Sequence, residues 1–424
     1  MIEVSADMST LYATEVGFVI PTMGEELSAR RRARKVIDLP GTRLAGRLYV
    51  LAQSHAGNTQ PLQIMVNGRG LEPVRPEGVR YRWYEVHAPV DALRVGPNLF
   101  EFWSDADAMD AWALGIEYGH EPSASHISTD RGATWKRDRI GHLHVGAGEY
   151  LVRVRLEEGD DPPPPALVLG QPTDPGALEL GRILPPQATE PGDTLTRVRS
   201  LATWTSTAWH YRNEKTAVHY APWDPLTILA WGGAGTGHDN RTPIVMCVHY
   251  AITFVAACAA VGIAARPAAF QPDDVNSTNG HFAAEVWVAE SQRWILVDPQ
   301  LDAIFFEGGR PMSFEEVREA GSDLPRHVQW GPGYGFQTRS TTMRQWVRQV
   351  FLSGECFRHR AVWPRSDFVS HPERTPPWHG PTAYSELDFV WEAADVDRGF
   401  GMFRYFVGPD WFSAPPNAVS RGGE

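Results

Sequence analysis

Apolar and polar residues alternate along short segments of the first part of the chain, which is the pattern of β-strands with one buried face. Each segment ends at turn residues, and Asn67-Gly68 is typical of a two-residue hairpin. We predict an all-β sandwich over residues 39–157, preceded by an N-terminal lead over residues 1–38. The predicted strands are Arg47 to Ala52, Leu62 to Val66, Tyr81 to Val86, Asn98 to Trp103, Ala113 to Tyr118 and Tyr150 to Leu156.

Two stretches of unusual composition flank the sandwich. Arg30 to Lys35 is densely basic, and we expect a solvated segment that leads into the first strand. Glu157 to Pro165 is acidic and ends in four prolines, which favour a stiff extended spacer. The chain stays rich in proline and glycine to residue 192, so residues 158–192 are predicted to be a linker. Asp193 is then a good N-cap for a following helix.

The apolar pattern changes at Val245 to Ala265, a run of apolar and small residues that is rich in alanine. A run of this length and composition favours a buried helix, with Pro243 before its start and Gly262 at its end. Cys247 then falls in the first turn. Unpaired backbone N–H groups and the positive end of the helix dipole stabilise a thiolate there, which makes Cys247 a candidate nucleophile.

A predicted β-hairpin follows the helix. Phe282 to Val288 alternates and is rich in valine and tryptophan, Glu290 to Arg293 is a polar turn, and Trp294 to Val297 returns. A tight turn places Asp298 opposite Ala283, on the same face as His281 and within side-chain reach of it. A carboxylate bound to one imidazole nitrogen leaves the other nitrogen free to accept the thiol proton.

These residues together carry a family resemblance. The chain has Cys247-x-x-Tyr-Ala at the head of an alanine-rich helix, then Gly-His281-x-x-x-Glu-Val-Trp, then Trp-x-x-Val-Asp298-Pro. The order, spacing and flanking residues resemble the transglutaminase-like superfamily of cysteine enzymes over roughly a quarter of the chain, about residues 193 to 305. The resemblance implies a papain-related α+β core with Cys247, His281 and Asp298 as its triad. We expect this core to span residues 193–310.

Some features near the motif stay open. Residues 236–245 are longer than the usual link before the nucleophile, so the loop there can differ from the family. The family often uses an upstream tryptophan or glutamine in its oxyanion hole, but neither Trp209 nor Trp231 lies in an assignable motif. Asp302 is expected to be a turn or cap residue. A zinc site of Cys247, His249, His281 and Asp298 is the alternative to catalysis, but Cys247 and His249 do not share a helix face.

The last part of the chain, residues 311–424, is expected to be an extension that packs on the core. Ser313-Phe-Glu-Glu316 is a capping-box helix start, and Thr341 to Leu352 has helical spacing of apolar residues. A tail rich in proline, histidine and tryptophan follows. Its aromatic residues are expected to wrap the core, with the wall of a substrate cleft as the alternative.

Two motifs in the sandwich bear on carbohydrate binding. Leu93-x-x-Gly-x-Asn98-x-Phe-x-Phe102 resembles a strand entry of galactose-binding jelly rolls, which often bind glycans. Ser128-Thr-Asp130-Arg-Gly-Ala-Thr-Trp135 matches the Asp-box of sialidases, whose logic is a hydrogen-bonded turn and not catalysis. The resemblance therefore makes carbohydrate binding by the sandwich one expectation, with a purely structural module as the other.

Composition sets limits on these interpretations. A chain of 424 residues is longer than one core usually supports, so several domains are expected. Its formal net charge of −12 argues against nucleic-acid or anionic-membrane partners. Three cysteines lack the spacing of a disulfide framework, and the first residues lack a secretory pattern, so a cytoplasmic location is expected.

The function that follows is cysteine-dependent acyl transfer, with hydrolysis of a peptide or amide favoured over cross-linking. The resemblance implies the preference for hydrolysis. We expect the partner to be a peptide, amide or glycoconjugate substrate, and we expect no metal and no cofactor. One alternative is an amidase acting on glycans or glycopeptides, by analogy with peptide N-glycanases. Another is a non-catalytic carbohydrate- or protein-binding protein that retains the fold.

Overall fold

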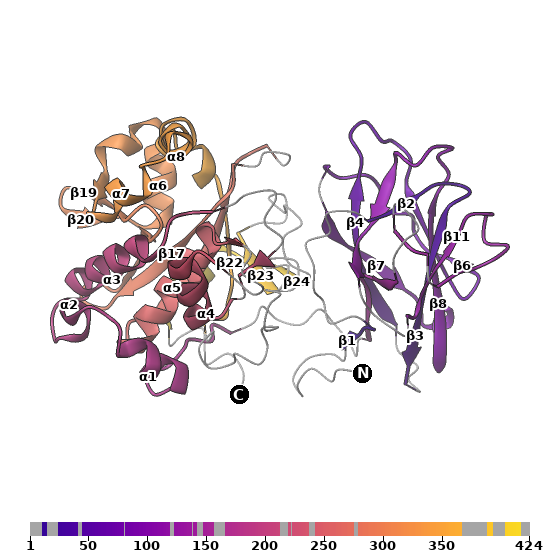
Figure 1. Cartoon of the computed structure of the whole chain (residues 1–424), viewed down its shortest axis with the longest axis horizontal. Coiled ribbons are helices and arrows are strands. Elements are labelled where there is room, and N and C mark those ends of the chain that lie inside the picture. The colour runs from indigo at the N-terminus through magenta and orange to yellow at the C-terminus, as the bar shows by residue number, and fades with distance from the viewer. Residues whose placement is uncertain are drawn as a thin grey trace. The chain divides into compact units, whose positions relative to one another are not determined.

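The computed structural model divides the chain into two compact units, Met1–Pro162 and Pro163–Glu424 (Figure 1). Two short segments within residues 384–402 group with the first unit. Each unit is described by itself. The described residues are 11–14, 24–40, 45–79, 81–118, 123–137, 139–141, 147–156, 166–212, 219–221, 223–236, 242–274, 279–366, 388–392 and 403–416.

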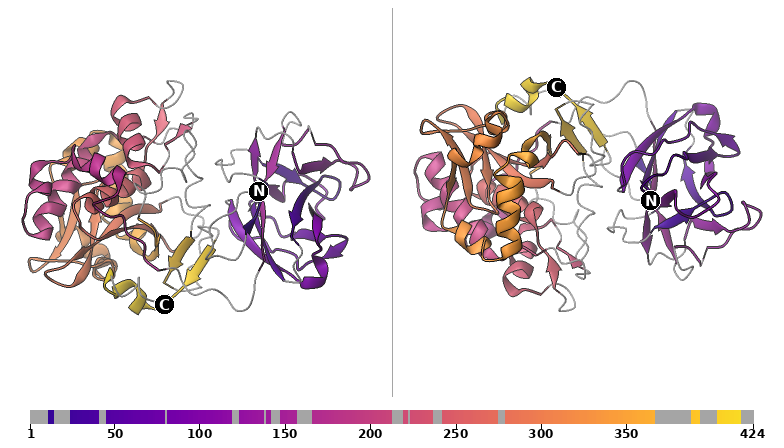
Figure 2. Two further views of the ribbon diagram at one scale, coloured as in Figure 1. Left: turned by 90° about the horizontal axis from the view of Figure 1, so that it is seen from below. Right: turned by 90° about the horizontal axis from the view of Figure 1, so that it is seen from above.

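The N-terminal unit consists of antiparallel sheets, which confirms the predicted sandwich (Figure 2). A six-stranded sheet has the order β1-β13-β4-β9-β2, with β7 beside β4, and a five-stranded sheet has the order β11-β3-β8-β5-β6. Their inward side chains form one apolar core. Asn67 and Gly68 have positive φ angles of 51° and 86° in the hairpin between β5 and β6, as its sequence indicates. The strand bounds are β1 Leu11–Tyr12, β2 Glu25–Leu27, β3 Arg32–Leu39, β4 Gly46–Ser54, β5 Leu62–Val66, β6 Arg69–Gly70, β7 Arg82–Ala88, β8 Gly96–Ser104, β9 Trp112–Leu114, β10 Ile116–Tyr118, β11 Ser125–Ser128, β12 Gly148–Tyr150 and β13 Val152–Leu156.

The basic run at Arg30 to Lys35 is not a solvated lead, and this prediction was wrong. It enters β3, a strand inside the five-stranded sheet, so the sandwich includes residues assigned to the lead. Lys35 is fully buried, and its Nζ donates to the Tyr150 carbonyl at 2.5 Å and lies 3.8 Å from a Glu149 oxygen. Arg31 is paired with the buried Glu25. Buried partners for the charges explain why a strand can carry them.

The turn of the Asp-box follows β11. An Asp130 oxygen accepts from the Thr134 backbone N–H at 2.9 Å, and Trp135 Nε1 donates to the Gly132 carbonyl at 3.0 Å. The Trp135 ring also lies 3.8 Å below the Arg34 guanidinium, and Arg32 is placed similarly, 4.6 Å above Trp103. These cation–π contacts pack the two tryptophans against side chains of β3.

The C-terminal unit is built on a nine-stranded sheet of order β20-β19-β18-β17-β16-β22-β23-β24, with β21 beside β19. Only the pair β23/β24 is parallel in this sheet, within the described residues. The strand bounds are β14 His219–Tyr220, β15 Pro243–Ile244, β16 Ala265–Gln271, β17 His281–Val288, β18 Arg293–Asp298, β19 Ala303–Glu307, β20 Arg310–Pro311, β21 Val328–Trp330, β22 His359–Val362, β23 Asp388–Trp391 and β24 Phe403–Phe406. The helix bounds are α1 Pro175–Gly181, α2 Pro186–Thr189, α3 Thr194–Ala208, α4 Pro225–Ala234, α5 Cys247–Ala260, α6 Phe314–Ala320, α7 Gly333–Gln337, α8 Thr341–Trp346 and α9 Pro409–Ser413.

Part of the expected linker is folded. The structure shows α1 and α2 between residues 175 and 189, each with a proline at its first turn, where the missing N–H costs nothing. Their buried residues Ala177, Leu180 and Ala188 pack the helices, and α1 lies against α5. Pro175 and Pro186 therefore mark the starts of helices inside the segment that was predicted to be a linker. The four consecutive prolines lie outside the described residues.

The two faces of the large sheet have different covers. Helix α5 packs on β16 and β17, with α3 and α4 beside it (Figure 1). Alternate side chains of the same strands point the other way. There Phe270, Leu296 and Phe305 share an apolar core with residues of α6, α8 and the segment Val347–Phe357. Within the described residues no helix, α5 included, is long and apolar enough to cross a bilayer.

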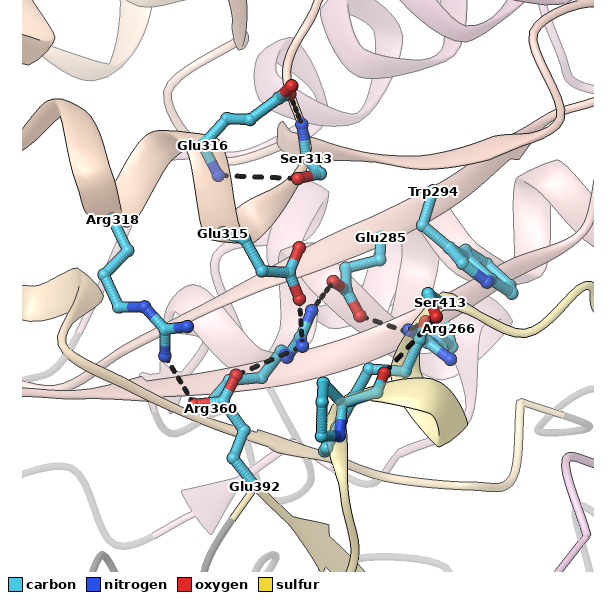
Figure 3. Close-up of polar contacts among 12 residues, drawn as sticks. Arg266, Glu285, Trp294, Ser313, Glu315, Glu316, Arg318, Arg360, Glu392 and Ser413 are labelled. Atoms are coloured by element: carbon cyan, nitrogen blue, oxygen red, sulfur yellow. Dashed lines mark hydrogen bonds and ion pairs between the residues drawn. The ribbon is translucent and has the colours of Figure 1, made fainter.

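A buried ion-pair cluster also joins the sheet to the later segments (Figure 3). Glu285 of β17 binds Arg266 of β16 at 2.9 Å and Arg360 of β22 at 2.5 Å. Arg360 also contacts Glu315 of α6 and Glu392 after β23. Glu285, Arg266 and Arg360 are each at most 1% exposed. The chain after residue 311 is therefore bound to the central strands by charge as well as by apolar packing.

Candidate active site

Cys247 is the first residue of α5, as the sequence predicts, and it is 8% exposed. The Met246 backbone N–H before it donates to His249 Nδ1 at 3.0 Å, and His249 Nε2 donates to the Ala221 carbonyl at 2.8 Å. His249 thus ties Met246 and Ala221 to the first turn of α5. The thiol lies in the first turn of the helix, at the positive end of its dipole.

His249 therefore has a structural role. Burial lowers its pKa to about 4, so its ring is neutral at physiological pH. Both ring nitrogens are bound to the backbone and neither is open to a metal. Within the described residues no group of three or more His, Cys, Asp or Glu side chains is arranged to hold a metal ion.

The second part of the site is the hairpin of β17 and β18, whose register is confirmed. Ala284 pairs with Val297, so the next positions along, Ala283 and Asp298, face each other as predicted. His281 Nε2 donates to Asp298 Oδ2 at 2.7 Å. Both side chains are at most 2% exposed.

Asp298 is itself held in place. Its second oxygen, Oδ1, accepts from the backbone N–H groups of Gln300 and Leu301, both at 2.9 Å. The turn after β18 therefore orients the carboxylate toward His281. Since Nε2 is engaged by Asp298, Nδ1 is the ring nitrogen that remains for Cys247.

The charge state of His281 follows from these neighbours. Burial opposes a charged ring, but the Asp298 carboxylate and then a hydrogen bond to Cys247 outweigh it, and the pKa of His281 is raised to about 10. The interaction with Cys247 brings the helix start and the hairpin together, which the sequence could not show. Asp298 and Cys247 thus lie on either side of a ring that holds its proton at neutral pH.

The network under the nucleophile helix includes a residue that the sequence gave no reason to select. Gln337 at the end of α7 is 4% exposed, and its Nε2 donates to the Ser206 and Trp209 carbonyls at 2.5 and 2.7 Å. It also contacts the hydroxyl of Tyr250, one turn after Cys247. Trp209 stacks on Tyr250 with ring centroids 4.3 Å apart. Only the three-dimensional neighbourhood of α3, α5 and α7 shows this role.

Asp302, expected to be a turn or cap residue, lies at a left-handed position with φ of 52°. Its Oδ2 accepts from the Thr203 hydroxyl and from the Gly333 N–H, both at 2.8 Å. It therefore ties the turn after β18 to α3 and to the start of α7. Half of the long link before Cys247, residues 237–241, lies outside the described residues.

His281 also contacts two aromatic rings beyond the hairpin. Trp346 lies 5.1 Å from its ring centroid, and Phe351 meets it edge-on at 6.0 Å. Both residues belong to the segment in which the sequence predicts a helix. The apolar spacing indicated the helix, but it gave no sign that Trp346 would reach the candidate base.

Comparison with known proteins identifies a family for part of the chain. Residues 184–299 match the Transglutaminase-like superfamily. No curated protein sequence matches the chain. Solved structures that are similar include a proposed cysteine protease from Cytophaga hutchinsonii, at 12% identity and a TM-score of 0.24, over 64% of this chain and 75% of that one. Red sea bream transglutaminase is similar at 11% identity and a TM-score of 0.23, over 75% of this chain and 55% of that one.

The matched segment contains Cys247, His281 and Asp298. The chain is thus a multidomain protein in which a β-sandwich is followed by a domain of the transglutaminase-like superfamily.

Proposed function

We propose that the protein is a cysteine-dependent acyl-transfer enzyme that hydrolyses a peptide or amide bond. Cys247 is the nucleophile, His281 the proton carrier and Asp298 the group that orients His281. The observation that carries this proposal is the position of the His281 ring, which is bound to Asp298 at 2.7 Å on one side and interacts with Cys247 on the other.

The reaction would proceed in two stages. His281 holds the proton at the start, so the Cys247 sulfur attacks the amide carbonyl carbon as a thiolate and forms a tetrahedral adduct. His281 then gives its proton to the leaving nitrogen, the C–N bond breaks, and a thioester remains on Cys247. Water, deprotonated by His281, attacks the thioester, which releases the carboxylic acid and restores the Cys247 thiolate beside protonated His281. Asp298 keeps the imidazolium oriented and stabilised throughout.

The cysteines of the chain provide an internal test. Cys258 and Cys356 are fully buried, and burial raises the pKa of each thiol. We expect iodoacetamide to label Cys247 faster than either of them in the native protein, when labelling is followed by mass spectrometry against pH. Replacing His281 by Ala should remove that difference in rate.

A screen of peptide amides should then give hydrolysis that is lost in Cys247→Ala. If Cys247 reacts no faster than Cys258, or reacts equally fast without His281, the catalytic proposal is wrong. In that case the protein would be a binding protein that retains the fold. A hydrolysed glycopeptide with no cleavage of the unglycosylated peptide would instead favour the glycan-directed alternative.

A further inference from the structure

The side of the His281 ring not used by Asp298 or Cys247 is covered by a segment beyond the family match. Helix α8 ends at Trp346 and continues into a π-helical turn, Val347–Phe351. The Trp346 ring lies 5.1 Å from the His281 ring at an interplanar angle of 53°. Trp346 is half-buried, whereas His281 is 2% exposed. The indole is therefore the more exposed ring of this contacting pair.

The π-helical turn explains how both ends of this segment reach His281. The Leu352 N–H donates to the Val347 carbonyl at 2.9 Å, a span of five residues instead of four. Val347 is buried in the core under the sheet, as is Phe351, whose ring edge meets His281. Such a turn is costlier than regular helix and occurs often at functional sites.

The region beneath Trp346 has few polar contacts. Gln300 lies in the turn two residues after Asp298, and its backbone N–H donates to Asp298 Oδ1. It is 1% exposed, its Nε2 contacts the Met343 sulfur at 3.7 Å, and its Oε1 has no hydrogen-bond partner within the described residues. A buried acceptor without a partner would bind water if water entered. Water admitted here would therefore find an acceptor on a residue that is itself bound to Asp298.

We propose that Trp346 is a positioning residue for the reaction: its indole keeps water from the His281–Asp298 pair and holds the imidazole in line between Asp298 and Cys247. The proposal rests on the proposed function and extends it to a residue after the matched segment. An ion pair is stronger in a dry environment, because water screens the charges and competes for their hydrogen bonds. The charged and titratable groups that act on this pair are Cys247 and Cys356, together with Asp302.

Trp330 offers a matched control. It is half-buried like Trp346, it contacts the same Phe351 ring at 5.9 Å against 6.0 Å for Trp346, and it stacks on Tyr334. Trp330 belongs to β21 and lies among the aromatic residues on the core, but its described ring contacts do not include His281. A loss of aromatic packing alone should affect both tryptophan variants.

The experiment measures iodoacetamide labelling of Cys247 in the full-length protein between pH 5 and 10 for wild type, Trp346→Ala, Trp346→Phe and Trp330→Ala. In Trp346→Ala we expect the labelling rate at pH 6.5 to fall about tenfold and the half-maximal point to move about one pH unit higher. Trp346→Phe, which keeps an aromatic cover, should stay within about threefold of wild type, as should Trp330→Ala. Thermal melting of each variant shows whether it is folded.

The outcomes separate this inference from the proposed function. Unreactive Cys247 in the wild type overturns both. Reactive wild-type Cys247 with equal profiles in Trp346→Ala and Trp330→Ala overturns only the role of Trp346. If Trp346→Ala does not fold, Trp346→Leu takes its place, because a folded leucine variant with the wild-type profile also overturns the role.

Discussion

At the scale of single residues, Asp298 determines what His281 can do. One carboxylate oxygen binds the imidazole and the other accepts two backbone N–H groups, so both oxygens are held by protein groups. The raised pKa of His281, about 10, means that the ring keeps its proton through the neutral range. A protonated ring can give that proton to the leaving amine.

The first prediction concerns the pH profile of hydrolysis. Activity toward a peptide amide should fall as pH rises through the His281 titration near pH 10, because the acid for the leaving amine is then lost. In Asp298→Asn this alkaline limb should move toward the ordinary histidine range, and the maximal rate should fall by about a hundredfold or more. The measurement is kcat/KM against pH. An unchanged alkaline limb in Asp298→Asn would contradict the assignment.

The second prediction concerns stability, in a Cys247→Ala background that removes the thiol titration. A histidine whose folded pKa is raised stabilises the fold fully below its unfolded pKa, and this stabilisation is lost as pH rises to the folded pKa. The free energy of unfolding should therefore decrease between about pH 6.5 and 10, with a slope approaching about 1.4 kcal/mol per pH unit. Adding Asp298→Asn should flatten the slope. Urea unfolding at fixed pH values measures it, and equal slopes in the two proteins would exclude the ion pair.

Sequence reasoning reached part of this residue-scale picture. The His281–Asp298 contact followed from strand alternation and a tight turn, because a two-residue period fixes which side chains share a face. The approach of Cys247 to His281 could not be derived, since it depends on how α5 docks on the sheet. The contacts of Gln337 and Trp346 could not be predicted for the same reason. Their contacts join segments far apart in the chain, and no local pattern records them.

At the scale of elements, Glu285 links three strands and α6 through two arginines (Figure 3). Arg266 also donates to the Phe412 carbonyl of α9 at 2.6 Å. A buried ion pair adds little to the free energy of unfolding relative to apolar residues of similar volume in its place. Removing one partner, however, leaves an uncompensated buried charge. Glu285 is therefore the point at which the cluster is most sensitive.

The third prediction follows from that asymmetry. Glu285→Ala should lower the free energy of unfolding by about 3 to 5 kcal/mol, because two buried guanidinium groups lose their shared carboxylate. Arg318→Ala is the control. Its partner Glu392 is still held by Arg360, and Arg318 is one-third exposed, so a loss of about 1 kcal/mol or less is expected. Chemical unfolding measures both, and equal losses would show that the cluster is not cooperative.

Strands and helices were predicted well where the spacing of apolar residues and the turn or cap residues indicated the same bounds, as in β5 and at the start of α6 at Ser313. They were missed where composition alone was used. Charge at Arg30 to Lys35 concealed an alternating strand, because Lys35 finds a buried carbonyl as partner. Proline in residues 175–189 suggested a spacer, but proline also begins helices.

At the scale of the whole molecule, the family match ends at residue 299 although the domain's core does not. Strand β22 pairs with β16 inside the sheet, and the face that includes Phe270 and Leu296 is covered by residues after 311. Residues 311–424, which were expected to be an extension, therefore supply strands to the sheet as well as side chains that cover one of its faces. His281 and Asp298 lie on strands whose one face this second layer covers, and Cys247 lies on α5, which packs on the same sheet from the other face.

The last prediction tests that dependence with two fragments. Residues 163–424 should fold and keep selective labelling of Cys247, because the site and both layers of its core lie within this unit. Residues 163–310 should not, because β16 loses its partner β22 and the apolar side chains under α6 and α8 become exposed to water. Circular dichroism melting and Cys247 labelling distinguish the two. A shorter fragment that melts cooperatively and labels selectively would mean that the matched segment folds alone; the later strands would then serve a purpose other than completing the core.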